Sequence, residues 1–279
     1  IRPVTLKRII QVCSLLHEVK AADVQAVSKE LCLSNDRAKE ILLELQLIGL
    51  LTVENKIYYA NKQTKEILQY YEENCWEKLH EYFMQNYRFY KDFIEILKNN
   101  TASKGLTFEE IELSSEKQNF NLNQTAITVL SDWCERLGVI QRHLFTRRLY
   151  LTIYSQPPSF QIFKDTLQNY YREFCTVHHK RNLFVEIPAL REDIAEKLRI
   201  KRTKFDELLK ELFLANIGKM ELSGAPITTL AKKSPFSEKK MKLDQKTAIL
   251  SPKFEACKQR EGLVVGKKAY YYLSIYEQL

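Results

Sequence analysis

The chain has 279 residues, of which 45% are hydrophobic, and this is enough apolar material for two or three domains with their own cores, so a wholly disordered protein is excluded. The seven glycines and seven prolines leave long stretches without a helix breaker, which favours helices and leaves little material for phosphate-cradling glycine loops. The formal net charge of +8 favours a polyanionic partner, because clustered Lys and Arg gain affinity by releasing counterions from phosphates.

Residues 1–62 predict three helices followed by a hairpin. Apolar residues recur at helical spacing in three segments, 4–16, 22–31 and 35–47. Ser34 suits the N-cap of the third helix, because its hydroxyl can accept a hydrogen bond from an amide of the first turn. Gly49 suits the end of that helix, because glycine adopts left-handed backbone angles without steric cost. Two short strands are expected to follow, at 50–53 and 57–59.

Residues 63–87 are predicted to form a helical linker, continuous over 65–87. Its apolar and aromatic residues recur at helical spacing: Leu68, Tyr71, Trp76, Leu79 and Phe83. The favoured interpretation is a helix that packs between domains, and an aromatic cage is the alternative.

The next segment, 88–156, repeats the order of the first. A helix is expected through Phe93 and Leu97, and a shorter one at 108–113. Asn123 suits the N-cap of a third helix, and Gly138 suits its end. A hairpin is then predicted, with strands at 139–143 and 148–153.

Residues 157–279 repeat the order once more. A helix is predicted at 160–175, a small strand at 185–187, and a helix opened by Pro188, where the missing amide is harmless. The third helix is expected at 201–214, with Asn216 in place of the glycine. The strands are predicted at 217–222 and 269–275, separated by a long insertion over about 224–268.

The three junctions after the third helices are alike. They read Ile48-Gly49-Leu50, Leu137-Gly138-Val139 and Ala215-Asn216-Ile217, and each is followed by an aromatic closing strand, at 57–60, 149–152 and 270–273. With this threefold pattern the chain resembles the winged helix-turn-helix superfamily over nearly its whole length. The resemblance implies a mainly α fold with small β-hairpins (α+β), built as three tandem winged-helix domains at 1–62, 88–156 and 157–279 and joined by the helical linker.

The resemblance also implies that the third helix of each unit enters the major groove of DNA and that the wing touches the backbone or minor groove. In the first unit the outward positions of that helix include the acids Asp36, Glu40 and Glu44, which favours a protein partner for the N-terminal half. The second unit offers neutral side chains suited to base edges, namely Asn123, Gln124, Thr125 and Thr128. Its wing adds Arg142, Arg147 and Arg148.

The third unit is the strongest electrostatic candidate for nucleic-acid binding. Lys201, Arg202 and Lys204 cluster at the start of its third helix, where free backbone amides favour phosphate. Residues 224–279 hold eleven Lys or Arg and five Asp or Glu, so they carry most of the net charge. The candidate contacts there are Lys239, Lys240, Lys242, Lys267 and Lys268. An ordinary solvated surface is the alternative interpretation of these charges.

No pattern of catalytic residues stands out. The sequence lacks a P-loop, a dinucleotide glycine fingerprint, H-E-x-x-H and G-x-S-x-G. His178 and His179 are adjacent and so fall on different faces of a helix, which favours a surface role over zinc. We therefore expect that the protein is not an enzyme and has no cofactor and no metal.

The six cysteines are widely spaced and form no C-x-x-C, which favours free thiols in a reducing compartment. No apolar run reaches 18 residues and no secretory leader is apparent, so we expect no membrane span and an intracellular location, in the cytoplasm, nucleoid or nucleus. The predicted function is binding of double-stranded DNA by a transcription regulator, a replication initiator or a defence or repair component. The alternative is a tandem winged-helix scaffold for protein interactions, or a subunit of a larger complex.

Overall fold

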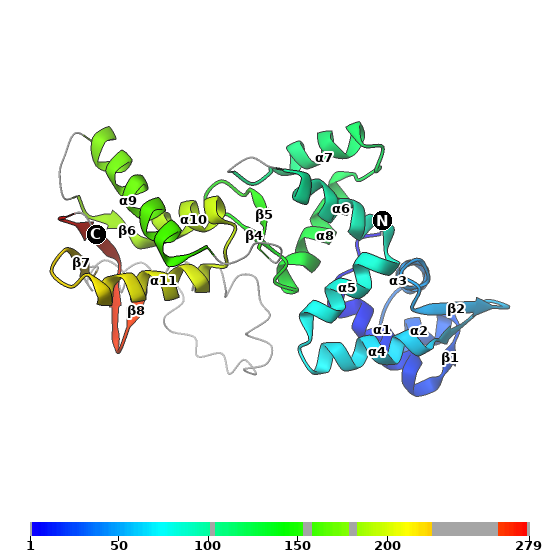
Figure 1. The fold of residues 1–279 in the computed structure, drawn as a ribbon. Coiled ribbons are helices and arrows are strands. Elements are labelled where there is room, and N and C mark those ends of the chain that lie inside the picture. The colour runs from blue at the N-terminus through cyan, green and yellow to red at the C-terminus, as the bar shows by residue number, and fades with distance from the viewer. Residues whose placement is uncertain (1, 101–103, 153–157, 179–182, 225–261, 278–279) are drawn as a thin grey trace. The chain divides into compact units, whose positions relative to one another are not determined.

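A computed structural model describes residues 2–100, 104–152, 158–178, 183–224 and 262–277 (Figure 1). The chain is mainly helical with small antiparallel sheets, which confirms the predicted α+β class. It divides into two compact units: unit 1 comprises Ile1–Arg142 and Arg147–Ile153, and unit 2 comprises His143–Thr146 and Tyr154–Leu279.

Unit 1 begins with three helices and a three-stranded sheet. These elements are α1 (Leu6–Val19), β1 (Ala21–Ala22), α2 (Val24–Glu30), α3 (Asn35–Leu47), β2 (Leu51–Glu54) and β3 (Ile57–Ala60). The predicted cap is confirmed, because the Ser34 side chain accepts a hydrogen bond from the Arg37 amide at 3.2 Å. Gly49 has a φ of 80°, as the predicted helix end requires. Strand β1 was not expected from the sequence; it pairs with β3 and gives the order β1-β3-β2.

The prediction of one continuous linker helix is wrong. The segment forms two helices, α4 (Lys62–Glu72) and α5 (Trp76–Asn86). Between them Asn74 has a φ of 56°, which an α-helix cannot accommodate, and Asn tolerates this left-handed region better than most residues do. Helical periodicity persists across such a break because both halves bury an apolar face, including Ile67 on α4 and Phe83 on α5.

The rest of unit 1 repeats the helix and hairpin order. Its elements are α6 (Arg88–Asn99), α7 (Phe108–Lys117), α8 (Gln124–Arg136), β4 (Ile140–Arg142) and β5 (Leu149–Leu151). Asn123 caps α8 as predicted, since its side chain accepts from the Ala126 amide at 2.9 Å. Thr107 and Glu110 form a reciprocal capping box at the start of α7.

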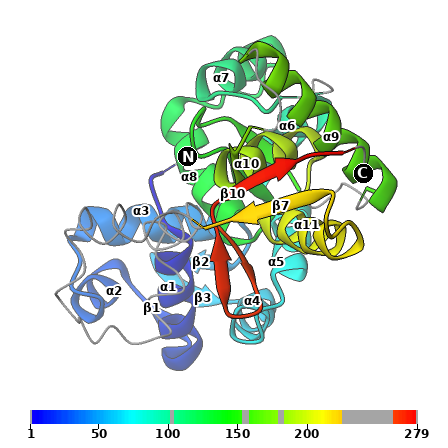
Figure 2. The same cartoon turned by 90° about the vertical axis from the view of Figure 1, so that its left-hand side faces the viewer.

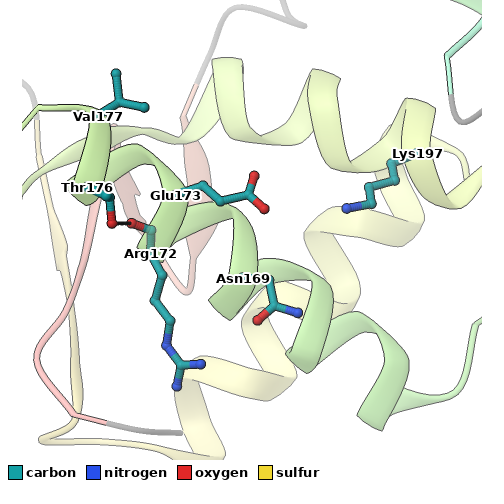
Figure 3. A pocket seen from close by; sticks show the side chains of 6 residues that line it. All are labelled: Asn169, Arg172, Glu173, Thr176, Val177 and Lys197. Atoms are coloured by element: carbon teal, nitrogen blue, oxygen red, sulfur yellow. Dashed lines mark hydrogen bonds between the residues drawn. The ribbon is translucent and has the colours of Figure 1, made fainter.

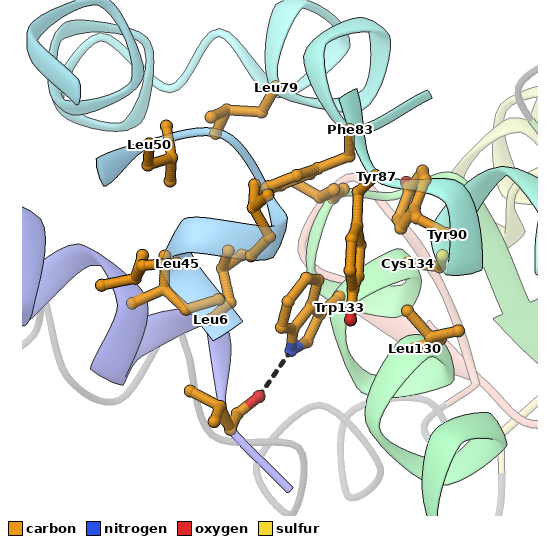
Figure 4. Close-up of a cluster of buried hydrophobic side chains, with 14 of the residues drawn as sticks. Leu6, Leu45, Leu50, Leu79, Phe83, Tyr87, Tyr90, Leu130, Trp133 and Cys134 are labelled. Atoms are coloured by element: carbon orange, nitrogen blue, oxygen red, sulfur yellow. Dashed lines mark hydrogen bonds between the residues drawn. The ribbon is translucent and has the colours of Figure 1, made fainter. Parts of the chain in front are cut away.

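The described residues of unit 1 share one hydrophobic core that extends from Val4 to Leu151, and Figure 4 shows part of it. At its centre Trp133 of α8 stacks on Tyr87, with ring centroids 5.8 Å apart, and lies 5.5 Å from the ring of Phe83 on α5. The first helical group, the α4–α5 pair and the second helical group therefore share one core.

The prediction that Glu44 of α3 faces outward is wrong, because this residue is fully buried. Its carboxylate accepts hydrogen bonds from the Tyr87 hydroxyl and from the Arg2 amide. The helical spacing of its apolar neighbours does not reveal this, since a tyrosine 43 residues away supplies the partner.

In its described residues unit 2 has three helices and a three-stranded sheet of order β6-β10-β7. They are α9 (Phe160–Val177), β6 (Val185–Glu186), α10 (Ile187–Leu198), α11 (Arg202–Ala215), β7 (Met220–Ser223) and β10 (Tyr272–Ile275). Pro188 stands in the first turn of α10, as predicted. A second core forms around Phe163 of α9 and Phe205 of α11, whose ring centroids are 5.5 Å apart.

The prediction of one strand over 269–275 is wrong, because these residues belong to two strands. Strand β10 pairs with β7 in an antiparallel manner, with Leu273 opposite Leu222. The preceding residues instead form a separate ribbon of β8 (Leu263–Val265) and β9 (Lys268–Tyr270). The ribbon, drawn in orange-red, projects from unit 2 (Figure 1, Figure 2).

Candidate nucleic-acid interface

The start of α11 presents one uncommitted lysine. Lys201 is the N-cap residue, its backbone is extended, and its side chain is exposed and does not cap the helix. Within the described part of the chain Lys201 makes no ion pair. Lys204, one turn further on, lies 3.0 Å from Glu207 in a surface pair, which in water contributes little and leaves the ammonium group available to other anions.

Arg202 does not join this surface, which corrects the prediction that it binds nucleic acid. Its residue exposure is 9%, and its Nη2 lies 2.6 Å from Oε2 of the fully buried Glu192 on α10. The guanidinium group also donates through Nε to the other carboxylate oxygen. This two-point hydrogen-bonded ion pair compensates both charges. Removing Arg202 would leave the buried carboxylate of Glu192 without its cation.

A second pair joins the same two helices. Arg191 of α10, 3% exposed, donates through Nε to Oδ1 of Asp206 on α11 at 2.8 Å. Burial raises the pKa of the Asp206 carboxyl, and Arg191 opposes this rise. The two pairs fix α11 on α10 and so fix which side of α11 faces solvent.

The β8–β9 ribbon is anchored at its base and turned tightly at its tip. Leu263 is 1% exposed, and β8 packs against α11. At the base a Cβ on Gly262 would lie 2.0 Å from the carbonyl oxygen of Tyr270, so only glycine fits between the strands there. At the tip Gly266 has a φ of 62° in a two-residue turn, the arrangement of a type II′ hairpin.

The end of the ribbon is basic and carries no acid. Lys267 and Lys268 are exposed, and neither makes an ion pair with any residue that the structure describes. Residues 262–270 contain no Asp or Glu. The ribbon therefore presents two uncompensated cations on a well-anchored support.

The predicted base-reading residues lie at the start of α8 in unit 1. Gln124, Thr125 and Thr128 are exposed, while the Asn123 oxygen is used as the helix cap. The Thr128 hydroxyl donates to the Gln124 carbonyl at 2.8 Å, so it retains only acceptor capacity. The first turn of α8 contains no acid.

The three arginines predicted for the second hairpin differ in their surroundings. Arg142 donates to Glu135 at 3.0 Å and lies over the ring of Phe108 at 5.1 Å, so it stabilises unit 1 and is a poor phosphate contact. Arg147 is exposed with a φ of 61°, and Arg148 is half-buried. The predicted contacts Lys239, Lys240 and Lys242 lie outside the described residues.

The hairpin residues 143–146 belong to unit 2 and are held there by hydrogen bonds. The amides of Phe145 and Thr146 donate to Nδ1 of the buried His143, each at 3.2 Å. An atom that accepts from amides carries no proton, so neutral His143 has its proton on Nε2, which donates to Asp193 at 3.1 Å. His143 is a structural residue, and it is not a phosphate ligand.

A shallow surface pocket of about 460 Å³ lies between α9 and α10 (Figure 3). Its lining is polar apart from Val177, with Asn169, Arg172, Glu173 and Thr176 on α9 and Lys197 on α10. In Figure 3 Glu173 and Lys197 point toward each other, and Arg172 points away. The charges are mixed and exposed, so the pocket does not select a ligand class.

Other chemistry has no visible support in the part of the chain that the structure describes. No group of three or more His, Cys, Asp or Glu there is placed to hold a metal ion. The five described cysteines are free, and Cys257 lies outside the described residues. No described helix has the length and apolarity needed to cross a membrane.

Comparison of the chain with protein-family models and with curated proteins finds no match.

Sequence reasoning missed the ribbon, although its signal was present. Gly266 and Lys267 separate the short segments 263–265 and 268–270, and a glycine in the first position of a two-residue turn is a hairpin signal. The tyrosines at 270–272 resemble a continuous strand and obscured the break at Tyr271.

Proposed function

We propose that this protein binds double-stranded DNA without catalysing a reaction and that unit 2 supplies the main contact. The observation that carries the proposal is the β8–β9 ribbon, whose two exposed lysines have no acidic neighbour on the ribbon. Such cations gain binding energy by displacing condensed counterions from a duplex. Lys201 and Lys204, at the start of α11, are further solvent-accessible cations of unit 2, and β8 packs against the same helix.

The order of elements supports a finer assignment to three tandem winged-helix domains. Three helices followed by paired strands occur as α1–α2–α3 with β2–β3, as α6–α7–α8 with β4–β5, and as α9–α10–α11 with β7–β10. In this assignment α3, α8 and α11 occupy equivalent positions. A transcription regulator, a replication initiator and a defence or repair component are the roles that fit such a DNA-binding protein.

A second candidate function, protein interaction, is favoured by α3. Asp36 and Glu40 stand on its solvent side, and Arg37 is engaged by Glu40 at 2.7 Å and by the Pro3 carbonyl. These two acids offset Arg37 and the exposed Lys39, so the solvent side of α3 carries no net positive charge to attract phosphate. The N-terminal part of unit 1 is accordingly the proposed contact for a protein partner.

The test is binding of a random-sequence duplex over a salt series. We expect steep weakening as salt rises and a shallower slope for the variant Lys201→Ala/Lys267→Ala/Lys268→Ala, by about 0.9 for each phosphate that the variant no longer neutralises. Lys117→Ala, at an exposed position on α7 of unit 1, is the matched control and leaves the slope unchanged. Absent or salt-independent binding would refute the DNA proposal and favour the scaffold.

A further inference from the structure

The β8–β9 ribbon has an apolar outer face as well as a basic tip. The register pairs Leu263 with Tyr270, Val264 with Ala269 and Val265 with Lys268. Because side chains alternate along a strand, Val264 and Ala269 share the face opposite to the buried Leu263. Val264 is 48% exposed and Ala269 is exposed, so two aliphatic side chains stand in water on this face, while Lys268, opposite Val265, is on the other face and Lys267 lies in the turn.

The dimensions and chemistry of this face suit one groove of the duplex. A two-stranded ribbon fits a major groove, which is about 12 Å wide in B-form DNA, better than a minor groove of about 6 Å. The aliphatic pair has no donor or acceptor with which to read base edges. The only apolar group that a base presents in the major groove is the C5-methyl of thymine.

We infer that the ribbon enters the major groove of B-form DNA with Val264 and Ala269 against thymine methyl groups and with Lys267 and Lys268 toward the flanking phosphates. This rests on the proposed function and narrows its ligand to thymine-containing duplex DNA. Double-stranded RNA is excluded as the preferred ligand, because its major groove is deep and narrow and uracil lacks the methyl group.

The test compares two duplexes of identical sequence, one with thymine and the other with deoxyuridine throughout. The exchange removes only methyl groups and preserves charge, so salt-dependent binding is retained for both. We expect the wild-type protein to prefer the thymine duplex by about fourfold for each methyl group that the ribbon buries. The variant Val264→Ser/Ala269→Ser is expected to bind both duplexes equally.

The wild-type comparison needs no substitution, so it stands even if a variant folds poorly. Circular dichroism and melting of the serine variant check its fold, which should be intact because both positions are exposed. Salt-dependent but equal binding of the two duplexes by the wild type overturns the groove assignment and leaves the proposed function standing. Displacement of the protein from the duplex by a minor-groove dye would also overturn the assignment of the ribbon to the major groove. Failure to bind either duplex removes the proposed function and this inference together.

Discussion

The indole N–H of Trp133 donates a hydrogen bond of 3.0 Å to the backbone carbonyl of Val4, 129 positions earlier in the chain. Both residues are fully buried. The bond joins the segment before α1 to α8, although the α4–α5 pair lies between them in the sequence. Together with the hydrogen bond from the Tyr87 hydroxyl, at the start of α6, to Glu44 of α3, it makes the first and second helical groups parts of one folding unit.

Replacing Trp133 with Phe should therefore destabilise all of unit 1. The change removes the hydrogen bond, leaves the Val4 carbonyl buried without it and opens space beside Tyr87, so we expect a loss of about 2–4 kcal/mol. Urea unfolding monitored by circular dichroism measures it. Leu113→Ala, at a position 56% exposed on α7, is the control with little expected change. Loss of structure around α8 alone, with α1–α3 unaffected, would contradict the shared core.

Arg202→Ala should lower the stability of unit 2 far more than Lys201→Ala. Loss of the guanidinium group leaves the buried Glu192 carboxylate without this arginine, although the Leu144 amide still donates to it at 2.9 Å, and we expect a cost of about 3–5 kcal/mol. Lys201 is exposed, and its replacement should change the melting temperature little while weakening DNA binding. Thermal melting of the two single variants separates these effects. Equal melting temperatures would argue against the structural role of Arg202.

Stability should depend on pH through Asp92 of α6. Its Oδ2 makes no hydrogen bond with the described residues, and the ion pair with the exposed Arg88 is long, at 3.6 Å. Burial raises the pKa of the Asp92 carboxyl, while Arg88 opposes the rise. A raised folded-state pKa means that the favourable contribution is present at acid pH and is lost as pH rises through that pKa.

Asp92→Asn should accordingly be more stable than the wild type near pH 7, with the advantage shrinking toward pH 4. Urea midpoints across this range provide the measurement. Asp132→Asn, which removes a half-buried carboxylate that accepts from Arg136 at 2.8 Å, is the matched control and should bring no gain near pH 7. A gain for Asp92→Asn that does not vary with pH would show that desolvation of the charge is not its cause.

Gly262→Ala should disable the ribbon while sparing the rest of unit 2. The new methyl group would lie 2.0 Å from a carbonyl oxygen of the opposite strand, so the strands must separate. We expect affinity for a random duplex to fall about as far as in Lys267→Ala/Lys268→Ala. Gly224→Ala places its methyl group at an ordinary 3.6 Å from the Ala269 carbonyl and should bind as the wild type does. Wild-type affinity of Gly262→Ala would mean that the ribbon does not touch the duplex.

Local chemistry made the helices and their caps predictable. Ser34 and Asn123 act on amides three residues away, so their role is contained in a few neighbouring letters of the sequence. The antiparallel partnership of β7 and β10 was also foreseeable, because the apolar pattern of both strands persists on either side of the insertion.

Features that depend on distant partners were not predictable. Arg202 looks like part of a basic cluster, and only the packing of α11 on α10 brings it to Glu192. Glu44 looks like a solvent-facing acid until Tyr87 is known to lie against it. For the candidate interface, the charge pattern of the sequence identified the basic region. Which of its described cations are exposed, and which are held in an ion pair, is seen only in the tertiary structure.

The stacked rings at the centre of unit 1 bear on how this protein could have changed during its history. A duplication or deletion that separated α1–α3 from α6–α8 would expose Tyr87 and Trp133 to water. The apolar patch left where α1–α3 had packed would be prone to aggregation. The first two repeats can thus be gained, lost or exchanged only as a pair.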